Sequence, residues 1–189
     1  MNDLEKDIEA CLRVLKEGGL ILYPTDTVWG IGCDATNTKA VEKIYALKRR
    51  PEKKAMIVLV SEEQEVLQYT AATDLAVFDH LQKTHKPTTV IYEGAIGLAD
   101  NLVAEDGSIA IRICRDAFCR QLIKRFRKPI VSTSANISGE AVAPVFKEIS
   151  DEIIKSVDYV VKHRQDDNAI AEPSAVIRWT NGEVVILRP

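Results

Sequence analysis

The sequence predicts an α/β fold built on a mixed β-sheet, and three observations support this class. Apolar segments of strand length alternate along the chain with segments of helical periodicity. The last two apolar segments are joined across Asn181-Gly182, which is a strong signal for an antiparallel hairpin. A chain of 189 residues is also long enough to bury a core without a disulfide or a metal. We therefore expect residues 1–189 to form one domain.

End signals place the individual elements. A helix is expected from about Asp3 to Glu17, where two glycines stop it, and a buried strand over Leu20 to Tyr23 ends at the following proline. A second helix begins at Asn37 or Thr38 and has to end before Pro51. The other expected strands are Met56 to Val60, Thr88 to Tyr92, Ile109 to Ile113, Ile130 to Thr133, Ser174 to Trp179 and Glu183 to Arg188; the other helices lie near Asp74 to Thr84 and Asp116 to Phe126.

Composition and charge narrow the functional classes. The formal net charge of -3 argues against a general nucleic-acid coat, because phosphate binding draws on positive charge. The amino-terminal segment is acidic and amphipathic, and the longest apolar runs are too short to span a bilayer, so we expect a cytoplasmic protein without membrane contact. The four cysteines match no zinc or redox spacing and the three histidines are isolated, so we expect reduced thiols and no metal site.

The densest charged feature is the run Lys48-Arg49-Arg50-Pro51-Glu52-Lys53-Lys54, which follows the second helix with five cations in seven residues. Cations at a helix C-terminus complement the helix dipole, so the run is consistent with a solvated helix end. It also suits the binding of a polyphosphate, because Arg supplies a planar fork and Lys a point charge. The spacing alone leaves both interpretations open.

Two polar segments follow predicted strands, at the edge of an α/β sheet where ligands collect. One is Ser132 to Gly139, a run of hydroxyls and an amide, and the other is Pro24 to Thr27. Either segment is also explained as a polar turn that bonds its own backbone. Together with the cationic helix end they would form a phosphate-binding pocket, although neither the P-loop nor the G-x-G-x-x-G pattern is present.

Two further charged residues are informative. Arg112 interrupts the apolar strand Ile109 to Ile113, where alternation points it into a cleft or leaves it exposed at a sheet edge. Asp26 suits an acid, a base, a metal ligand or a simple turn cap. The sequence contains no recognisable pair of nucleophile and base, so covalent catalysis has no support.

These residues resemble the YrdC-like threonylcarbamoyl-AMP synthases. The resemblance rests on four motifs in family order across nearly the whole chain: Tyr23 to Gly32, the K-x-R-P run Lys48 to Pro51, the S-x-N run Ser134 to Asn136 followed by Ser138-Gly139, and the closing Ile186 to Pro189. It implies an open, twisted mixed sheet with flanking helices around a large cationic cavity. It also implies that L-threonine, bicarbonate or CO2, and ATP with Mg2+ condense to threonylcarbamoyl-AMP and pyrophosphate, and that a separate tRNA threonylcarbamoyl transferase consumes the adenylate.

The resemblance also implies roles for individual residues. A central cluster of Lys48, Arg50, Ser134 and Asn136 would bind the ATP phosphates, Ser108, Ser132 and Arg188 would help to hold the nucleotide, and Thr25, Thr27, Arg112 and Ser174 would bind threonine. None of these residues would be a metal ligand.

Departures from the family pattern keep two other functions open. His85-Lys86-Pro87 replaces Pro-Gly-Pro, Arg112-Ile113-Cys114 replaces R-x-P, and Ser174-Ala175-Val176 replaces Ser-Thr-Val. A paralogue that adenylates a different amine or acid would explain these changes. The rival from another class is a noncatalytic module that binds tRNA or double-stranded RNA through the basic run, which predicts strongly salt-dependent binding and no threonine-dependent ATP turnover.

Overall fold

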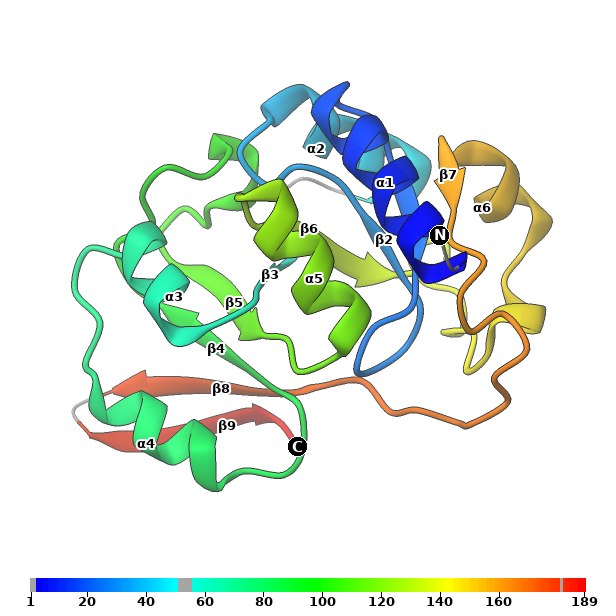
Figure 1. Ribbon diagram of the computed structural model, residues 1–189. Helices are drawn as coiled ribbons and strands as arrows, with labels where there is room; N and C mark the ends of the chain where they lie inside the picture. The colour runs from blue at the N-terminus through cyan, green and yellow to red at the C-terminus, as the bar shows by residue number, and fades with distance from the viewer. Residues whose placement is uncertain (1–2, 51–55, 181) are drawn as a thin grey trace.

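The fold is organised around one mixed β-sheet. The computed structural model describes residues 3–50, 56–180 and 182–189, in which nine strands form a single sheet of order β7-β1-β2-β6-β3-β5-β4-β8-β9 (Figure 1). The strands are β1 (Ile21–Tyr23), β2 (Gly30–Gly32), β3 (Ile57–Val60), β4 (Thr88–Tyr92), β5 (Ile109–Ile113), β6 (Ile130–Ser134), β7 (Tyr159–Val160), β8 (Ala175–Thr180) and β9 (Glu183–Arg188). The helices are α1 (Asp3–Lys16), α2 (Thr38–Leu47), α3 (Glu63–Tyr69), α4 (Ala76–Lys83), α5 (Ala117–Phe126) and α6 (Asp151–Ser156), with short 3-10 turns at Asp100–Leu102 and Phe146–Glu148.

The sheet pairing confirms the predicted mixed class. The pairs β1-β7, β3-β5 and β4-β8 are parallel, whereas β1-β2, β2-β6, β3-β6, β4-β5 and β8-β9 are antiparallel. The expected C-terminal hairpin is present, with Thr180 opposite Glu183 and Gly182 at a φ of 78°. Its other turn residue, Asn181, lies outside the described residues.

Helices α1, α3 and α5 lie on the same side of the sheet (Figure 1). Helix α1 buries Ile8, Cys11 and Leu15, which recur at helical spacing. It packs against α5, whose first turn is capped by Asp116 accepting the Cys119 N–H at 2.9 Å. Asn37 caps α2 in the same way, as its sequence position predicted. The opposite side of the sheet is therefore left for the cavity described below.

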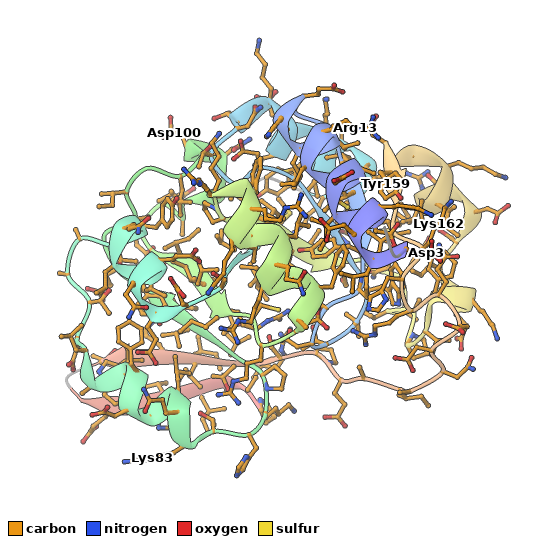
Figure 2. All side chains as sticks on the ribbon, in the orientation of Figure 1. Asp3, Arg13, Lys83, Asp100, Tyr159 and Lys162 are labelled. Carbon is orange, nitrogen blue, oxygen red and sulfur yellow. The ribbon has the colours of Figure 1, made fainter. Side chains whose placement is uncertain are left out.

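A buried carboxylate ties α1 to the crossover that follows β7. Asp7 is 1% exposed and accepts hydrogen bonds from the Tyr159 hydroxyl at 2.7 Å and from the Lys162 and His163 N–H groups. Figure 2 shows Tyr159 lying against α1, with Asp3 and Lys83 at the periphery of the molecule. Since a buried polar group has to find partners, Asp7 fixes the path of this crossover.

Four regular elements were not expected from the sequence: β2, β7, α3 and α6. Strand β2 is only Gly-Ile-Gly, which has no strand pattern, and its glycine at position 32 is required by close packing. A Cβ at Gly32 would lie 2.6 Å from both the Val131 carbonyl oxygen and the Tyr23 ring. The other three elements have at most seven residues each, too few for a periodic signal.

The cysteines are free and buried, as expected. Burial raises the pKa of the Cys11 and Cys33 thiols well above their ordinary value, so they stay protonated. Within the described part of the chain, no group of three or more His, Cys, Asp and Glu side chains gathers as a metal cage would require. In the same residues, no helix has the length and apolar character needed to cross a membrane.

Candidate active site

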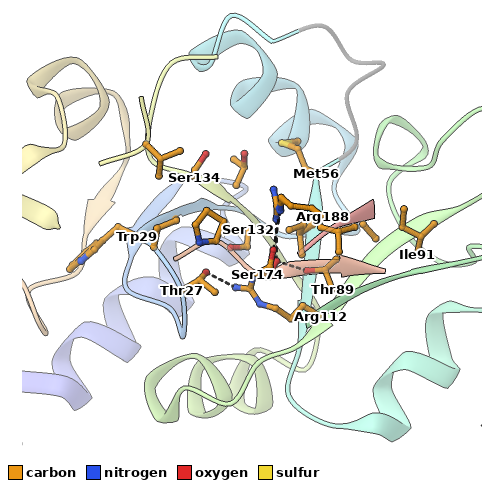
Figure 3. Close-up of a pocket in the computed structure, with 18 of the residues that line it drawn as sticks. Thr27, Trp29, Met56, Thr89, Ile91, Arg112, Ser132, Ser134, Ser174 and Arg188 are labelled. Carbon is orange, nitrogen blue, oxygen red and sulfur yellow. Dashed lines mark hydrogen bonds between the residues drawn. The ribbon is translucent and has the colours of Figure 1, made fainter. Parts of the chain in front are cut away.

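A cavity of about 300 Å³ lies against the sheet face opposite α1, α3 and α5 (Figure 3). Two rows of side chains that are neighbours across the sheet line it. Ser132, Ile57, Ala110 and Ile91 follow one another from β6 to β4, and Arg112, Thr89 and Val176 form the next row. Because residues in register project to the same side of a sheet, strand pairing alone assembles this wall.

Lys48 joins the end of α2 to the loop that follows β6. The residue is 1% exposed, and its Nζ donates to the Ser134 carbonyl at 2.5 Å, the Asn136 carbonyl at 2.6 Å and Asn136 Oδ1 at 3.3 Å. Ser134 Oγ donates to the same Oδ1 at 2.6 Å. Three acceptors therefore use the three ammonium donors, so Lys48 holds the S-x-N loop in place and supplies a charge behind it.

Burial lowers the pKa of Lys48 from its ordinary value to about 8, and the nearby charge of Arg50 lowers it further. Burial also lowers the pKa of the Arg50 guanidinium. Arg50 lines the cavity from the end of α2, whereas Lys48 lies behind the loop. Lys48 and Arg50 thus bring two positive charges to the same end of the cavity, Lys48 through the Ser134 loop and Arg50 directly.

The loop after β1 presents Thr27 to the cavity beside Arg112. The Nη2 atom of Arg112 donates to Thr27 Oγ1 at 3.2 Å (Figure 3). The same Nη2 atom lies 3.0 Å from Asp26 Oδ1. Asp26 Oδ2 accepts the Arg115 N–H at 3.2 Å, so Asp26 is an ion-pair partner rather than a cap of its own turn. Arg112 is 3% exposed, and its Nε has no hydrogen-bond partner among the described residues.

Thr25 supports this loop from behind. Its hydroxyl donates to the Val28 carbonyl at 2.9 Å, accepts the Thr27 N–H at 3.0 Å and lies 3.1 Å from the Thr27 hydroxyl. Thr25 is buried and is not among the residues that line the cavity. The polar-turn interpretation of the sequence therefore describes Thr25, whereas Thr27 lines the cavity.

The far wall of the cavity comes from β4, β8 and β9. Thr89 Oγ1 lies 2.9 Å from Ser174 Oγ, and Arg188 donates to the Ser174 hydroxyl at 3.3 Å and to its carbonyl at 3.0 Å (Figure 3). Strand β9 thus returns to the cavity because it pairs with β8. Thr89 was missed in the sequence, since only the register of β4 with β5 places it opposite Arg112.

The cavity brings together most of the predicted site residues. Those that line it are Thr27, Arg50, Arg112, Ser132, Ser134, Ser174 and Arg188. Lys48 and Asn136 lie directly behind Ser134. Ser108 precedes β5 on the same side as Ala110 and Arg112 but does not line the cavity, and it donates its N–H to Asp106 at 3.0 Å. Pro51, Glu52, Lys53 and Lys54 of the basic run lie outside the described residues.

Comparison with known proteins places this geometry in a family. The family model described as "Telomere recombination", Sua5/YciO/YrdC, matches residues 13–189. The chain belongs to the Sua5/YciO/YrdC family. It is 30% identical over 183 residues to a threonylcarbamoyl-AMP synthase of Pseudoalteromonas translucida, covering 95% of this chain and 97% of that protein. It is 31% identical to the threonylcarbamoyl-AMP synthase of Idiomarina loihiensis, covering 93% and 95%.

Solved structures of the Sua5/YciO/YrdC family share the fold. P. abyssi Sua5 complexed with L-threonine superposes with a TM-score of 0.85 at 21% identity, covering 100% of this chain. This chain spans 55% of that Sua5 chain. E. coli YciO superposes with a TM-score of 0.82 at 22% identity, covering 98% of this chain and 89% of that one. The open mixed sheet expected from the family resemblance is therefore confirmed.

Replacing Asp26 with asparagine is expected to lower the free energy of unfolding by about 3 kcal/mol, because it leaves the buried Arg112 charge without its counter-ion. Urea denaturation followed by circular dichroism measures the change. Asp3→Asn is the matched control, since Asp3 pairs with Lys6 on the surface and is largely exposed. Equal stability of the two variants would show that the Asp26–Arg112 pair does not support the loop.

Proposed function

We propose that this family member is an L-threonylcarbamoyl-AMP synthase, which condenses L-threonine, bicarbonate or CO2, and ATP and releases pyrophosphate. The observation that supports it most directly is the buried Arg112, which lines the cavity together with hydroxyl groups and two further arginines. The names of the relatives in Pseudoalteromonas and Idiomarina agree with this activity. The threonine in the Sua5 complex agrees with the amino-acid substrate.

Arg112 is the proposed site for the carboxylate of threonine. A guanidinium that gives its Nη2 atom to Asp26 and Thr27 still has further N–H donors for a carboxylate. Thr25 donates its own hydroxyl proton to Val28, so the Thr27 hydroxyl donates to Thr25 and keeps acceptor capacity for a donor of the ligand. Ser174, held by Thr89 and Arg188, bounds the same pocket.

Arg50, Ser132, Ser134 and Arg188 are the proposed contacts to ATP, with Lys48 and Asn136 fixing the Ser134 loop. Guanidinium and hydroxyl donors suit phosphate oxygens, and none of the described residues that line the cavity is acidic. The lining therefore fits magnesium that arrives with the nucleotide rather than an ion held by carboxylates. When bound there, magnesium neutralises charge on the phosphate oxygens. Ser108 is retained as a proposed nucleotide contact on the strength of the resemblance only.

The proposed reaction needs positioning and charge stabilisation rather than a protein nucleophile. The threonine amine adds to the carbon of CO2 and loses a proton, which gives a carbamate. A carbamate oxygen then bonds to the α-phosphorus of ATP while the bond from that phosphorus to the bridging oxygen breaks, and pyrophosphate leaves. The cationic groups Arg50, Lys48 and Arg188 stabilise the departing charge, and Arg112 holds the attacking molecule in line.

Pyrophosphate release from ATP, measured with bicarbonate and magnesium in the presence and absence of L-threonine, tests this function. We expect release that depends on threonine. Release with another amino acid but not with threonine would identify the paralogue with altered specificity. No turnover by folded protein, together with salt-dependent binding of tRNA or double-stranded RNA, would contradict the synthase and identify the RNA-binding module.

The affinity for ATP is expected to fall as the pH rises above about 8, the value to which burial lowers the pKa of Lys48. The protonated lysine attracts phosphate, so its deprotonation removes a positive charge from the site. The affinity for ATP then falls by at most about tenfold per pH unit. Lys48→Met is expected to bind ATP more weakly and without this dependence. Equilibrium binding of ATP to the wild-type protein and to Lys48→Met, measured at pH values below and above about 8, gives both affinities. A wild-type affinity that stays constant through that range would refute the role of the Lys48 charge.

In the proposed pathway the adenylate passes to a separate transferase that modifies tRNA, and the protein acts in the cytoplasm. The transfer step follows from the reaction, since a mixed carbamic–phosphoric anhydride is an activated group donor that has to be consumed by a group-transfer reaction.

A further inference from the structure

Arg49 lies between two residues of the proposed ATP site and has an unusual backbone conformation. Its φ is 50°, in the left-handed region that ordinarily favours glycine. The Arg49 N–H donates to the Ala46 carbonyl at 3.1 Å, and the Arg50 N–H donates to the Tyr45 carbonyl at 2.9 Å. This pair of bonds is the Schellman ending of a helix, in which glycine usually occupies the position of Arg49.

The turn at Arg49 separates the directions of its two neighbours. Before it, Lys48 points to the Ser134 loop, and the Lys48 carbonyl accepts the Ser138 N–H at 3.0 Å. After it, Arg50 lines the cavity. A right-handed residue at position 49 would continue α2 and send Arg50 in another direction, because each helical residue rotates the chain by a further step.

The side chain of Arg49 points away from the cavity. It forms an ion pair with Glu152 of α6 at 2.7 Å, in which the two side chains are 66% and 51% exposed. Exposed pairs of this kind contribute little to stability. The charge of Arg49 therefore does not explain why a residue other than glycine is held in this conformation. Strained backbone that is fixed by its surroundings gathers at functional sites, where it orients a group.

We propose that Arg49 is a positioning residue whose left-handed backbone, rather than its charge, directs Arg50 into the ATP site. The inference rests on the proposed function, because it assigns Arg50 to the phosphates. It predicts that position 49 tolerates loss of the side chain but does not tolerate a residue that disfavours the left-handed region.

Two substitutions at position 49 distinguish an effect of the backbone conformation from an effect of the side-chain charge. Arg49→Val introduces a β-branched residue, for which a positive φ is a genuine outlier, and is expected to raise the dissociation constant and the KM for ATP about fivefold or more while leaving the KM for threonine unchanged. Arg49→Gly removes the same charge but favours the turn, and is expected to retain the wild-type ATP affinity. Glu152→Gln, which only breaks the ion pair, is also expected to retain the wild-type ATP affinity. The ATP affinity of Arg49→Ala is expected to lie between those of Arg49→Val and Arg49→Gly, and Arg49→Ala replaces Arg49→Val if the valine variant does not fold.

Glu42→Val is the matched control, because it places valine at an exposed position of the same helix without a positive φ. Unchanged ATP affinity in Arg49→Val and Arg49→Ala would overturn the proposal, as would a loss in Arg49→Gly equal to that in Arg49→Val, which would assign the effect to charge. Equilibrium ATP binding keeps this test separate from the proposed function. If the wild-type protein binds ATP but releases no pyrophosphate with threonine, the synthase assignment fails while the binding series still tests Arg49.

Discussion

Replacing Arg112 with glutamine is expected to raise the KM for L-threonine about 100-fold, while the KM for ATP stays close to the wild-type value. A carboxylate held by two charge-assisted hydrogen bonds loses a few kcal/mol when the guanidinium becomes a neutral amide, and ~1.4 kcal/mol corresponds to tenfold. Steady-state pyrophosphate release, with each substrate varied in turn, measures the two constants separately.

Two further variants make the Arg112 result specific. Arg112→Lys keeps the charge near Asp26 but loses the planar fork, so its threonine KM is expected to lie between the wild-type and glutamine values. Arg120→Gln makes the same chemical change at an exposed position of α5 and is expected to change neither KM. Equal increases of both KM values in Arg112→Gln would indicate a general disturbance of the cavity and contradict the threonine assignment.

Replacing Arg50 with glutamine is expected to lower kcat about 100- to 1000-fold. Removing one preorganised donor from the charge that develops in a transition state has an effect of this size. The same substitution leaves the fold intact, because Arg50 is half-buried at the edge of the cavity and its backbone N–H still bonds the Tyr45 carbonyl. Pyrophosphate release at saturating substrates measures the change, with Arg120→Gln again as the control. A kcat within about twofold of wild type would remove Arg50 from the phosphate site.

The fold class could be predicted because it depended on local patterns in the sequence, whereas the roles proposed for most site residues came from the family resemblance. Arg112 stood out locally as well, since a charged residue within an alternating apolar strand already indicates a cleft or an edge, and it lines the cavity in the structure. The partner residue Thr89 could not be predicted, because nothing local specifies the register of β4 against β5. Strand β2 was missed for a similar reason, since Gly-Ile-Gly gains its strand conformation from its neighbours β1 and β6.

The basic run shows that adjacent cations of one segment can lie in different surroundings. Arg49 is an exposed cation at a helix end, as the solvated interpretation predicted, whereas Lys48 is buried and Arg50 faces the cavity. These three neighbouring side chains point in different directions because Arg49 has a left-handed backbone conformation. Sequence could not indicate that turn, because the residue that usually signals it is glycine.

The most direct test of the synthase assignment follows the carbon of bicarbonate into the product. Purified protein is incubated with ATP, magnesium, L-threonine and isotopically labelled bicarbonate, and the nucleotides are analysed by mass spectrometry. We predict an adenylate with the mass of threonylcarbamoyl-AMP that carries the label, formed together with pyrophosphate and absent from the Arg112→Gln variant at low threonine. An unlabelled threonyl adenylate, or unchanged ATP in the presence of folded protein, would contradict the assignment.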